Sequence, residues 1–266
     1  MKYLLSHYGA ISTRIREARH ILLLIDYDGT LTPIVEKPEL ADLSPEVKEC
    51  LQRLAAIPSV TLGIISGRIL TDLSERVGIK GIIYVGNHGL EIKGPGISFV
   101  NPVARQALPL MNSLYRDIGD AIADVKGARI DNKELTLTLH YRQVDKAQVD
   151  ELNDIFYKIV NSPLYSGQIS IVPDKKAYEL KPLVDWDKGK AIEFIALKLN
   201  YECKPLMLFL GDDVTDYNGF RQVNNNGGVS IFIGDIDVKT PATYFLYSPE
   251  EVYRFLGVLE DIISSR

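Results

Sequence analysis

The chain has 266 residues, of which 46% are hydrophobic and 24% charged, and this suits one large domain or two unequal ones with a sizeable core. Its 30 basic and 35 acidic residues give a net charge of −5, which offers no electrostatic case for a nucleic-acid partner. No apolar run approaches the roughly 20 residues of a membrane helix, and we see no signal-peptide stretch at the start of the sequence. The two cysteines, Cys50 and Cys203, have neither disulfide nor metal-ligand spacing. We therefore expect a cytoplasmic location.

The first strong signal is the apolar run 21–25, which is followed by Asp26-Tyr-Asp28-Gly-Thr30. Five apolar residues bounded by a turn signal predict a fully buried strand. Open α/β folds place their chemistry at the carboxyl edge of a parallel sheet. Asp26 and Asp28 are therefore candidates to attack an electrophile, to transfer a proton or to hold a cation. A polar strand end with an Asp-Gly turn is the alternative.

The next segments alternate between helix and strand. Ser44-Pro45 predicts the start of a helix, Val60–Ile65 a strand, residues 70–77 a helix and residues 82–85 another strand. This order predicts a doubly wound, Rossmann-like parallel sheet with right-handed crossovers. The second of these strands ends in Ser66-Gly67-Arg68, which places a hydroxyl and backbone N–H groups at a helix mouth, as in an anion site. The alternative is that Ser66 is only a helix N-cap.

The alternation of strand and helix gives way to a different pattern after about residue 100. Helices are expected over 102–125 and 145–160, with short strands over 168–172 and 177–180. Between the helices, apolar and polar residues alternate over 135–142, which predicts a half-buried strand with a polar face toward water or a substrate. The block is thus a separate α+β unit with an antiparallel sheet. We expect an α/β fold whose core domain comprises residues 1–100 and 181–266, with an inserted domain at 101–180.

The alternation of strand and helix resumes after Pro182. Lys188 opens a helix, and the apolar run 206–210 is a second continuous strand that ends in Gly211-Asp212-Asp213. Further strands are expected over 229–233 and 244–247, followed by a last helix to about residue 263.

These residues fit one reaction. If the strands 21–25 and 206–210 are neighbours, Asp26, Asp28 and Asp212 crowd one sheet edge, and their mutual repulsion calls for a cation. An all-oxygen ligand set favours Mg²⁺. Lys188 and Ser66 would neutralise a phosphoryl group that Asp26 attacks in line, with Asp28 as general acid and then base. Considered alone, each motif has an alternative interpretation: Lys188 could be a solvated surface charge, and Gly211–Asp213 could be a turn.

In this order, the motifs at Asp26-Tyr-Asp28-Gly-Thr30, Ser66, Lys188 and Gly211-Asp212-Asp213 resemble the haloacid dehalogenase (HAD) superfamily of phosphatases. The resemblance implies a HAD-like core in which Asp26 becomes an aspartyl phosphate and Asp28 is the acid/base. It also implies that Asp26, the backbone carbonyl of Asp28 and Asp212 bind Mg²⁺. The inserted α+β domain would then be a cap that closes over the sugar end of the substrate.

A narrower resemblance, to trehalose-6-phosphate phosphatases, covers most of the chain. It rests on Gly86–Glu91, on Asp131-Asn-Lys133 with His140-Tyr-Arg142, on Glu179–Pro182 and on Gly211–Asp216. The resemblance implies hydrolysis of trehalose 6-phosphate to trehalose and phosphate. Three positions depart from the family pattern, with Tyr217 in place of Glu, Lys181 in place of Arg and Asp131 in place of Glu. The departure at Tyr217 puts in question the support of the metal that the family's carboxylate at this position implies.

The same resemblance implies that Lys133, Arg142 and Glu179 contact sugar hydroxyls or phosphate from the cap. The alternative for Lys133 and Arg142 is a solvated strand face. Asn87 and His88 are candidates to face the sugar from the core side, with a purely structural His88 as the alternative. The substrate-binding candidates are thus Ser66, Gly67, Arg68, Asn87, His88, Lys133, Arg142, Glu179 and Asp213.

Three other functions stay open at this point. One is a phosphatase for another phosphorylated sugar or glycoside, such as sucrose phosphate or mannosylglycerate phosphate, because a few hydroxyl contacts decide such specificity. The second is a phosphomutase with the same aspartyl-phosphate chemistry, and the third a non-catalytic sugar-phosphate-binding module. The expected partner is a small sugar phosphate, with a functional link to a sugar-phosphate synthase, and neither nucleic acid nor membrane is expected.

Overall fold

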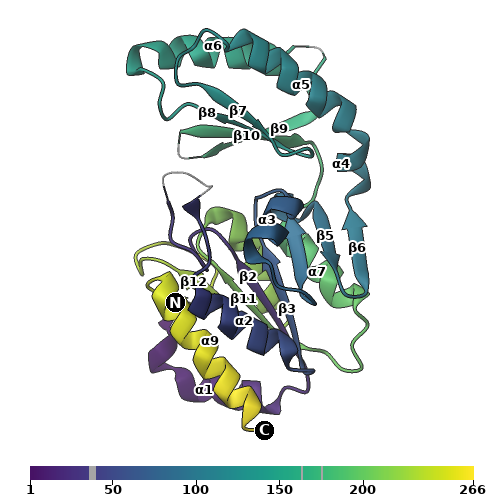
Figure 1. The fold of residues 1–266 in the computed structure, drawn as a ribbon, viewed down its shortest axis with the longest axis vertical. Coiled ribbons are helices and arrows are strands. Elements are labelled where there is room, and N and C mark those ends of the chain that lie inside the picture. Colours follow the sequence, from purple (N-terminus) through teal and green to yellow (C-terminus); the bar gives the residue numbers. More distant parts are fainter. Residues whose placement is uncertain (36–39, 163, 175) are drawn as a thin grey trace. The chain divides into compact units, whose positions relative to one another are not determined.

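The computed structural model describes residues 1–35, 40–162, 164–174 and 176–266 (Figure 1). The chain divides into two units, the first formed by Met1–Phe99 with Trp186–Arg266 and the second by Val100–Asp185. The sequence had placed the insertion at 101–180.

The first unit is built on a nine-stranded sheet in the order β1-β13-β12-β11-β2-β3-β4-β5-β6. Neighbouring strands from β1 to β4 pair in parallel, and β5 pairs with β4 in antiparallel register. Its strands are β1 (Lys2–Tyr3), β2 (Ile21–Asp26), β3 (Val60–Ile65), β4 (Ile83–Gly86), β5 (Glu91–Gly94), β6 (Ile97–Val100), β11 (Leu206–Gly211), β12 (Val229–Ile233) and β13 (Tyr244–Leu246). The predicted parallel α/β sheet is confirmed.

Strand β2 is apolar from Ile21 to Ile25 because helices cover both faces of the sheet. Ile21, Leu23 and Ile25 join a core formed with α1 (Tyr8–Glu17), α2 (Pro45–Ala56), α3 (Leu70–Val77) and α9 (Pro249–Ser264). Leu22 and Leu24 point to the opposite face and join a second core with α7 (Lys188–Lys198) and α8 (Tyr217–Asn225). A strand buried on both sides has no polar alternation, which is why the run 21–25 is continuous.

The second unit has its own core and its own sheet. Its antiparallel sheet has the order β7-β8-β10-β9, formed by β7 (Arg129–Asn132), β8 (Leu137–His140), β10 (Ala177–Pro182) and β9 (Ile169–Asp174). The apolar face packs with the helices α5 (Leu108–Ala121) and α6 (Val149–Val160), and the short helix α4 (Pro102–Gln106) precedes them.

Two details of this unit differ from the sequence prediction. The first long helix ends at Ala121 rather than near residue 125. Thr136, just before β8, and Thr138 on it are buried, so this part of the expected polar face does not lie open to water, and its other alternative, a face toward a substrate, stays a prediction. The reason is that β8 is an inner strand, and Thr138 lies between Asp131 on β7 and Glu179 on β10, whose longer side chains flank its short one.

Candidate functional site

An ion-paired lysine lies where β2 ends. Asp26 closes the strand and is 5% exposed. Lys188, the first residue of α7, places Nζ 2.6 Å from Oδ1 of Asp26 and 2.6 Å from Oδ1 of Asp216. Helix α7 begins here because Asp187 accepts a hydrogen bond from the backbone N–H of Lys190. Burial works to lower the pKa of Lys188, but the two carboxylates outweigh it and hold the pKa above its usual range, so the ammonium stays charged.

Three carboxylates meet around this lysine. Asp26, Asp212 and Asp216 each offer one oxygen, and these oxygens lie within 4.8 Å of one another. Burial, aided by the charge of Asp216, raises the pKa of Asp212 to about 7. Burial also raises the pKa of Asp26 well above its usual range, against the opposing effect of Lys188. A cation would offset the repulsion among the three carboxylates, and an all-oxygen set suits a hard divalent ion, so the cluster fits a metal site.

The sheet register and one glycine bring the acids together. Strands β2 and β11 are neighbours, and Leu210 pairs with Ile25, so Asp26 and Asp212 leave the same sheet edge. The predicted neighbourhood of the two apolar strands is thereby confirmed. Gly29 has a φ of +89°, and a Cβ there would lie 2.2 Å from Oδ2 of Asp212. Only glycine allows the carboxylate to approach the backbone this closely.

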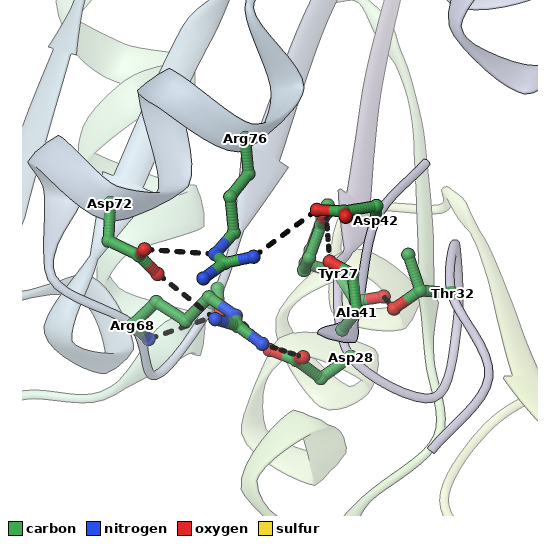
Figure 2. Close-up of polar contacts among 9 residues, drawn as sticks. Tyr27, Asp28, Thr32, Ala41, Asp42, Arg68, Asp72 and Arg76 are labelled. Carbon is green, nitrogen blue, oxygen red and sulfur yellow. Dashed lines mark hydrogen bonds and ion pairs between the residues drawn. The ribbon is translucent and has the colours of Figure 1, made fainter. Parts of the chain in front are cut away.

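Asp28 lies on the other side of the turn and has a different environment. Its side chain is 42% exposed. Arg68 donates hydrogen bonds to both carboxylate oxygens of Asp28, with Nε 2.8 Å from Oδ2 and one terminal nitrogen 2.6 Å from Oδ1 (Figure 2). The hydroxyl of Ser66 donates to Oδ2 over 3.3 Å. Asp28 is therefore the accessible, charge-paired acid of the site, and Asp26 is the buried one.

Ser66 is not the N-cap of the following helix, because α3 has Ile69 at that position. Its buried hydroxyl instead accepts a hydrogen bond from the backbone N–H of Arg68 and donates to Asp28. The N-cap interpretation of Ser66 is therefore wrong. The hydroxyl serves the acid pair rather than the helix.

The segment at residues 87–89 supports this loop from the side. The backbone N–H of Asn87 donates to the carbonyl of Arg68, and that of His88 donates to the carbonyl of Ser66. Asn87 also donates from its side chain to Glu91. The His88 ring fills the space beside Gly67, where a Cβ would lie 2.4 Å from the imidazole. Among the candidates for sugar contact, Asn87 is completely buried and His88 is held against the Ser66 loop.

The remaining substrate candidates belong to two places. Lys133, Arg142 and Glu179 lie in the second unit, and Glu179 is buried on β10. Asp213 in the first unit caps the short helix 214–216, because its side chain accepts a hydrogen bond from the backbone of Val214. Its side chain thus serves a local cap.

Sequence reasoning missed the role of Asp216. This residue is completely buried, and its Oδ2 accepts hydrogen bonds of 3.0 Å from the backbone N–H groups of Asp212 and Asp213. Its Oδ1 faces Lys188. The signal was present, since Asp216 belongs to the quoted motif Gly211–Asp216. Tyr217, which follows it, donates its hydroxyl to the carbonyl of Lys239.

Among the described residues, no helix combines the length and apolar character that crossing a membrane requires.

Comparison with known proteins gives a consistent pattern. A family model described as trehalose-phosphatase matches residues 24–250. Probable trehalose-phosphate phosphatase J of Arabidopsis thaliana is 32% identical over 262 residues, which cover 92% of this chain and 69% of that protein. Probable trehalose-phosphate phosphatase 3 of Oryza sativa subsp. japonica is 30% identical over 264 residues, which cover 92% of this chain and 71% of that protein.

A solved structure agrees with these relatives. The C-terminal domain of the C. albicans trehalose-6-phosphate phosphatase superposes with a TM-score of 0.80 at 26% identity. The superposition covers 95% of this chain and 96% of that domain.

Proposed function

Because this chain belongs to the trehalose-phosphatase family, we propose that it hydrolyses trehalose 6-phosphate to trehalose and phosphate through a phosphoryl group carried on Asp26. The observation that supports this most is the position of Lys188, 2.6 Å from the buried Asp26 at the end of β2. A buried carboxylate with a cation beside it is suited to approach a phosphate dianion, because the ammonium offsets the repulsion between the two anions.

The chain's own residues would carry out both halves of the reaction. Lys188 holds Oδ1 of Asp26, so we assign the in-line attack on phosphorus to Oδ2. As the bond between phosphorus and the sugar oxygen breaks, Asp28 gives a proton to that oxygen. A water then attacks the aspartyl phosphate, and Asp28 takes the proton of the water, which regenerates both acids.

The metal of the proposed reaction is Mg²⁺. Asp26, Asp212 and Asp216 would hold it, together with the backbone carbonyl of Asp28. When bound, the ion neutralises negative charge on the phosphoryl oxygens. The fit rests on the oxygen-only donor set and on the three carboxylate oxygens that lie within 4.8 Å of one another.

For the sugar, we propose contacts from the second unit. Lys133, Arg142 and Glu179 would bind sugar hydroxyls or phosphate, and the unit would act as the specificity-setting cap. Glu179 is buried on β10 directly opposite Thr138, which gives it the fixed position that selective recognition needs.

The test is phosphate release from a panel of esters, with trehalose 6-phosphate, sucrose phosphate and mannosylglycerate phosphate among them, in Mg²⁺ and in EDTA. We expect trehalose 6-phosphate to have the highest kcat/KM and EDTA to stop all release until Mg²⁺ is restored. Turnover of another ester about 100-fold faster would overturn the proposed substrate, a ratio that a few hydroxyl contacts can produce. Transfer of phosphate to another sugar position would indicate a mutase instead.

The nucleophile is tested by Asp26→Asn. We expect phosphate release to vanish while the fold persists, because the amide has the same shape and Lys188 keeps its contact with Asp216. Phosphate release and the thermal unfolding midpoint would be measured on the same preparation. Substantial turnover by a folded variant would rule out the covalent route.

A further inference from the structure

A chain of alternating charges continues from Asp28 away from the buried acids. Arg68 bridges from Asp28 to Asp72, with a nitrogen 3.0 Å from Oδ2 of Asp72. Arg76 contacts the other oxygen of Asp72 over 2.9 Å and reaches Asp42 over 3.2 Å (Figure 2). Asp72 and Arg76 lie one turn apart on α3, so their side chains meet, and Arg68 reaches Asp72 from the loop just before the helix.

The donors around Asp28 leave little room on its carboxylate. A carboxylate has about four lone-pair positions. Arg68 and Ser66 together occupy both positions on Oδ2, and Arg68 occupies one on Oδ1. Within the described part of the chain, the fourth position, on Oδ1, receives no donor. The geometry therefore favours Oδ1 of Asp28 as the atom through which the proton moves.

Arg68 determines where that oxygen points. Its side chain is only 10% exposed, and its guanidinium lies over the Tyr27 ring, 5.4 Å from the ring centre. The guanidinium is planar and its N–H donors point in fixed directions. The orientation of the Arg68 guanidinium therefore sets the orientation of the Asp28 carboxylate that it binds. The side chain of Asp72, by contrast, is 39% exposed and contacts Arg68 and Arg76 rather than Asp28.

We propose that Asp72 is a positioning residue for proton transfer: it fixes Arg68, and Arg68 in turn fixes Asp28 with Oδ1 free to exchange a proton. In the first half of the reaction, the proton on Oδ1 passes to the bridging ester oxygen as the bond from that oxygen to phosphorus breaks. In the second half, the attacking water returns a proton to Oδ1. This inference rests on the proposed function, because it assigns the acid/base role to Asp28.

The rival role for Arg68 is direct binding of the substrate phosphate, and the leaving group separates the two. An alkoxide leaves only with a proton, whereas nitrophenolate leaves without one. A positioning defect therefore harms an alkyl phosphate and spares p-nitrophenyl phosphate, whereas a phosphate-binding defect harms both equally. The comparison uses kcat/KM, which reports the steps up to the first irreversible one and so isolates the breaking of the ester bond.

The test variant is Asp72→Asn in the full chain. We expect kcat/KM for trehalose 6-phosphate to fall about tenfold, a part of the roughly 10²- to 10⁴-fold that a positioned general acid contributes. We expect the value for p-nitrophenyl phosphate to change by less than about twofold, since that step needs no proton. Arg76→Gln should give the same dependence on leaving group with a smaller fall, and it carries the test if Asp72→Asn does not fold.

The matched control is Arg53→Gln. It also breaks a two-point ion pair between arginine and carboxylate, in which Arg53 on α2 contacts Glu260 on α9 over 2.6 and 3.1 Å. We expect no change with either substrate. Equal falls for both substrates, or no fall for either, in folded Asp72 and Arg76 variants would overturn the inference. The rates of the wild-type protein alone decide the proposed function. If trehalose 6-phosphate is not its substrate, any alkyl phosphate that the wild type hydrolyses can serve as the substrate with a poor leaving group.

Discussion

The protonation of Asp212 links the pH dependence of stability to the binding of a metal ion. Burial, with Asp216 nearby, raises its pKa to about 7 from a usual value of 3.8. Because the folded-state pKa lies above the unfolded one, the stability that this group contributes is fully present below about pH 4 and is lost as the pH rises through about 7. The metal-free protein therefore becomes less stable as Asp212 ionises, and a bound cation would reverse that trend.

Mg²⁺ binding should consequently strengthen with pH. Below pH 7 the ion must displace a proton from Asp212, so we expect its apparent affinity to rise by about tenfold per pH unit and to level off above pH 7. The measurement is the Mg²⁺-dependent rise of the thermal unfolding midpoint at pH 6, 7 and 8. Asp212→Asn should bind more weakly and lose much of the slope. An affinity that is the same at all three pH values would contradict the assignment of Asp212 to the metal.

The turn after β2 is the element that makes the acid cluster feasible. Gly29 combines a φ of +89° with an Asp212 carboxylate in the space that a Cβ would occupy, so two requirements coincide at one residue. Gly81 has a similar φ of +80°, but there a Cβ would meet nothing within 4 Å. The two glycines therefore separate the backbone cost of a side chain from its steric cost.

Gly29→Ala and Gly81→Ala form a matched pair of variants. Gly81→Ala should lower the free energy of unfolding by about 1–2 kcal/mol, the cost of a left-handed backbone with a side chain. Gly29→Ala should cost more and should also raise the Mg²⁺ concentration needed for activity, because the new Cβ displaces the Asp212 carboxylate. Urea unfolding and Mg²⁺ titration of the rate would measure both effects. Equal behaviour of the two variants would show that the contact with Asp212 is unimportant.

The molecule as a whole is one α/β unit interrupted by another that has its own core. Among the residues that the structure describes, the second core is formed by side chains between residues 110 and 180. The chain leaves and re-enters the first unit at neighbouring points, because the rings of Phe99 and Trp186 stack with centres 5.1 Å apart. Residues 100–185 are therefore an insertion between two points of the chain that lie side by side in the first unit.

Replacing residues 101–184 by a short Gly-Ser linker tests this division. We expect a folded first unit that still hydrolyses p-nitrophenyl phosphate in Mg²⁺, because Asp26, Asp28, Lys188 and Asp212 all remain. Its preference for trehalose 6-phosphate over other sugar esters should disappear with Lys133, Arg142 and Glu179. Cooperative thermal unfolding and the ester panel would measure the two results. Retained sugar preference would place the specificity in the first unit.

The fold and the acid pairs were predictable from local patterns. A strand buried on both faces must be apolar throughout, so the runs 21–25 and 206–210 predicted inner strands, and the acids that follow them predicted one shared sheet edge. The polar face expected over 135–142 is not open to water at Thr136 and Thr138, because burial of a short side chain depends on the strands beside it rather than on its own alternation.

The pairings of the charged groups were beyond the reach of pattern reasoning. Lys188 meets Asp26 across 162 residues, and Arg68 meets Asp28 across 40, so each contact depends on sheet register and loop packing rather than on neighbouring sequence. Arg68 is a substrate-binding candidate by its motif, and its ion pair with the Asp28 carboxylate appears only in the folded chain. Residue type tells which charges are available, whereas the energy of a charge depends on distance and burial, and these exist only once the chain has folded.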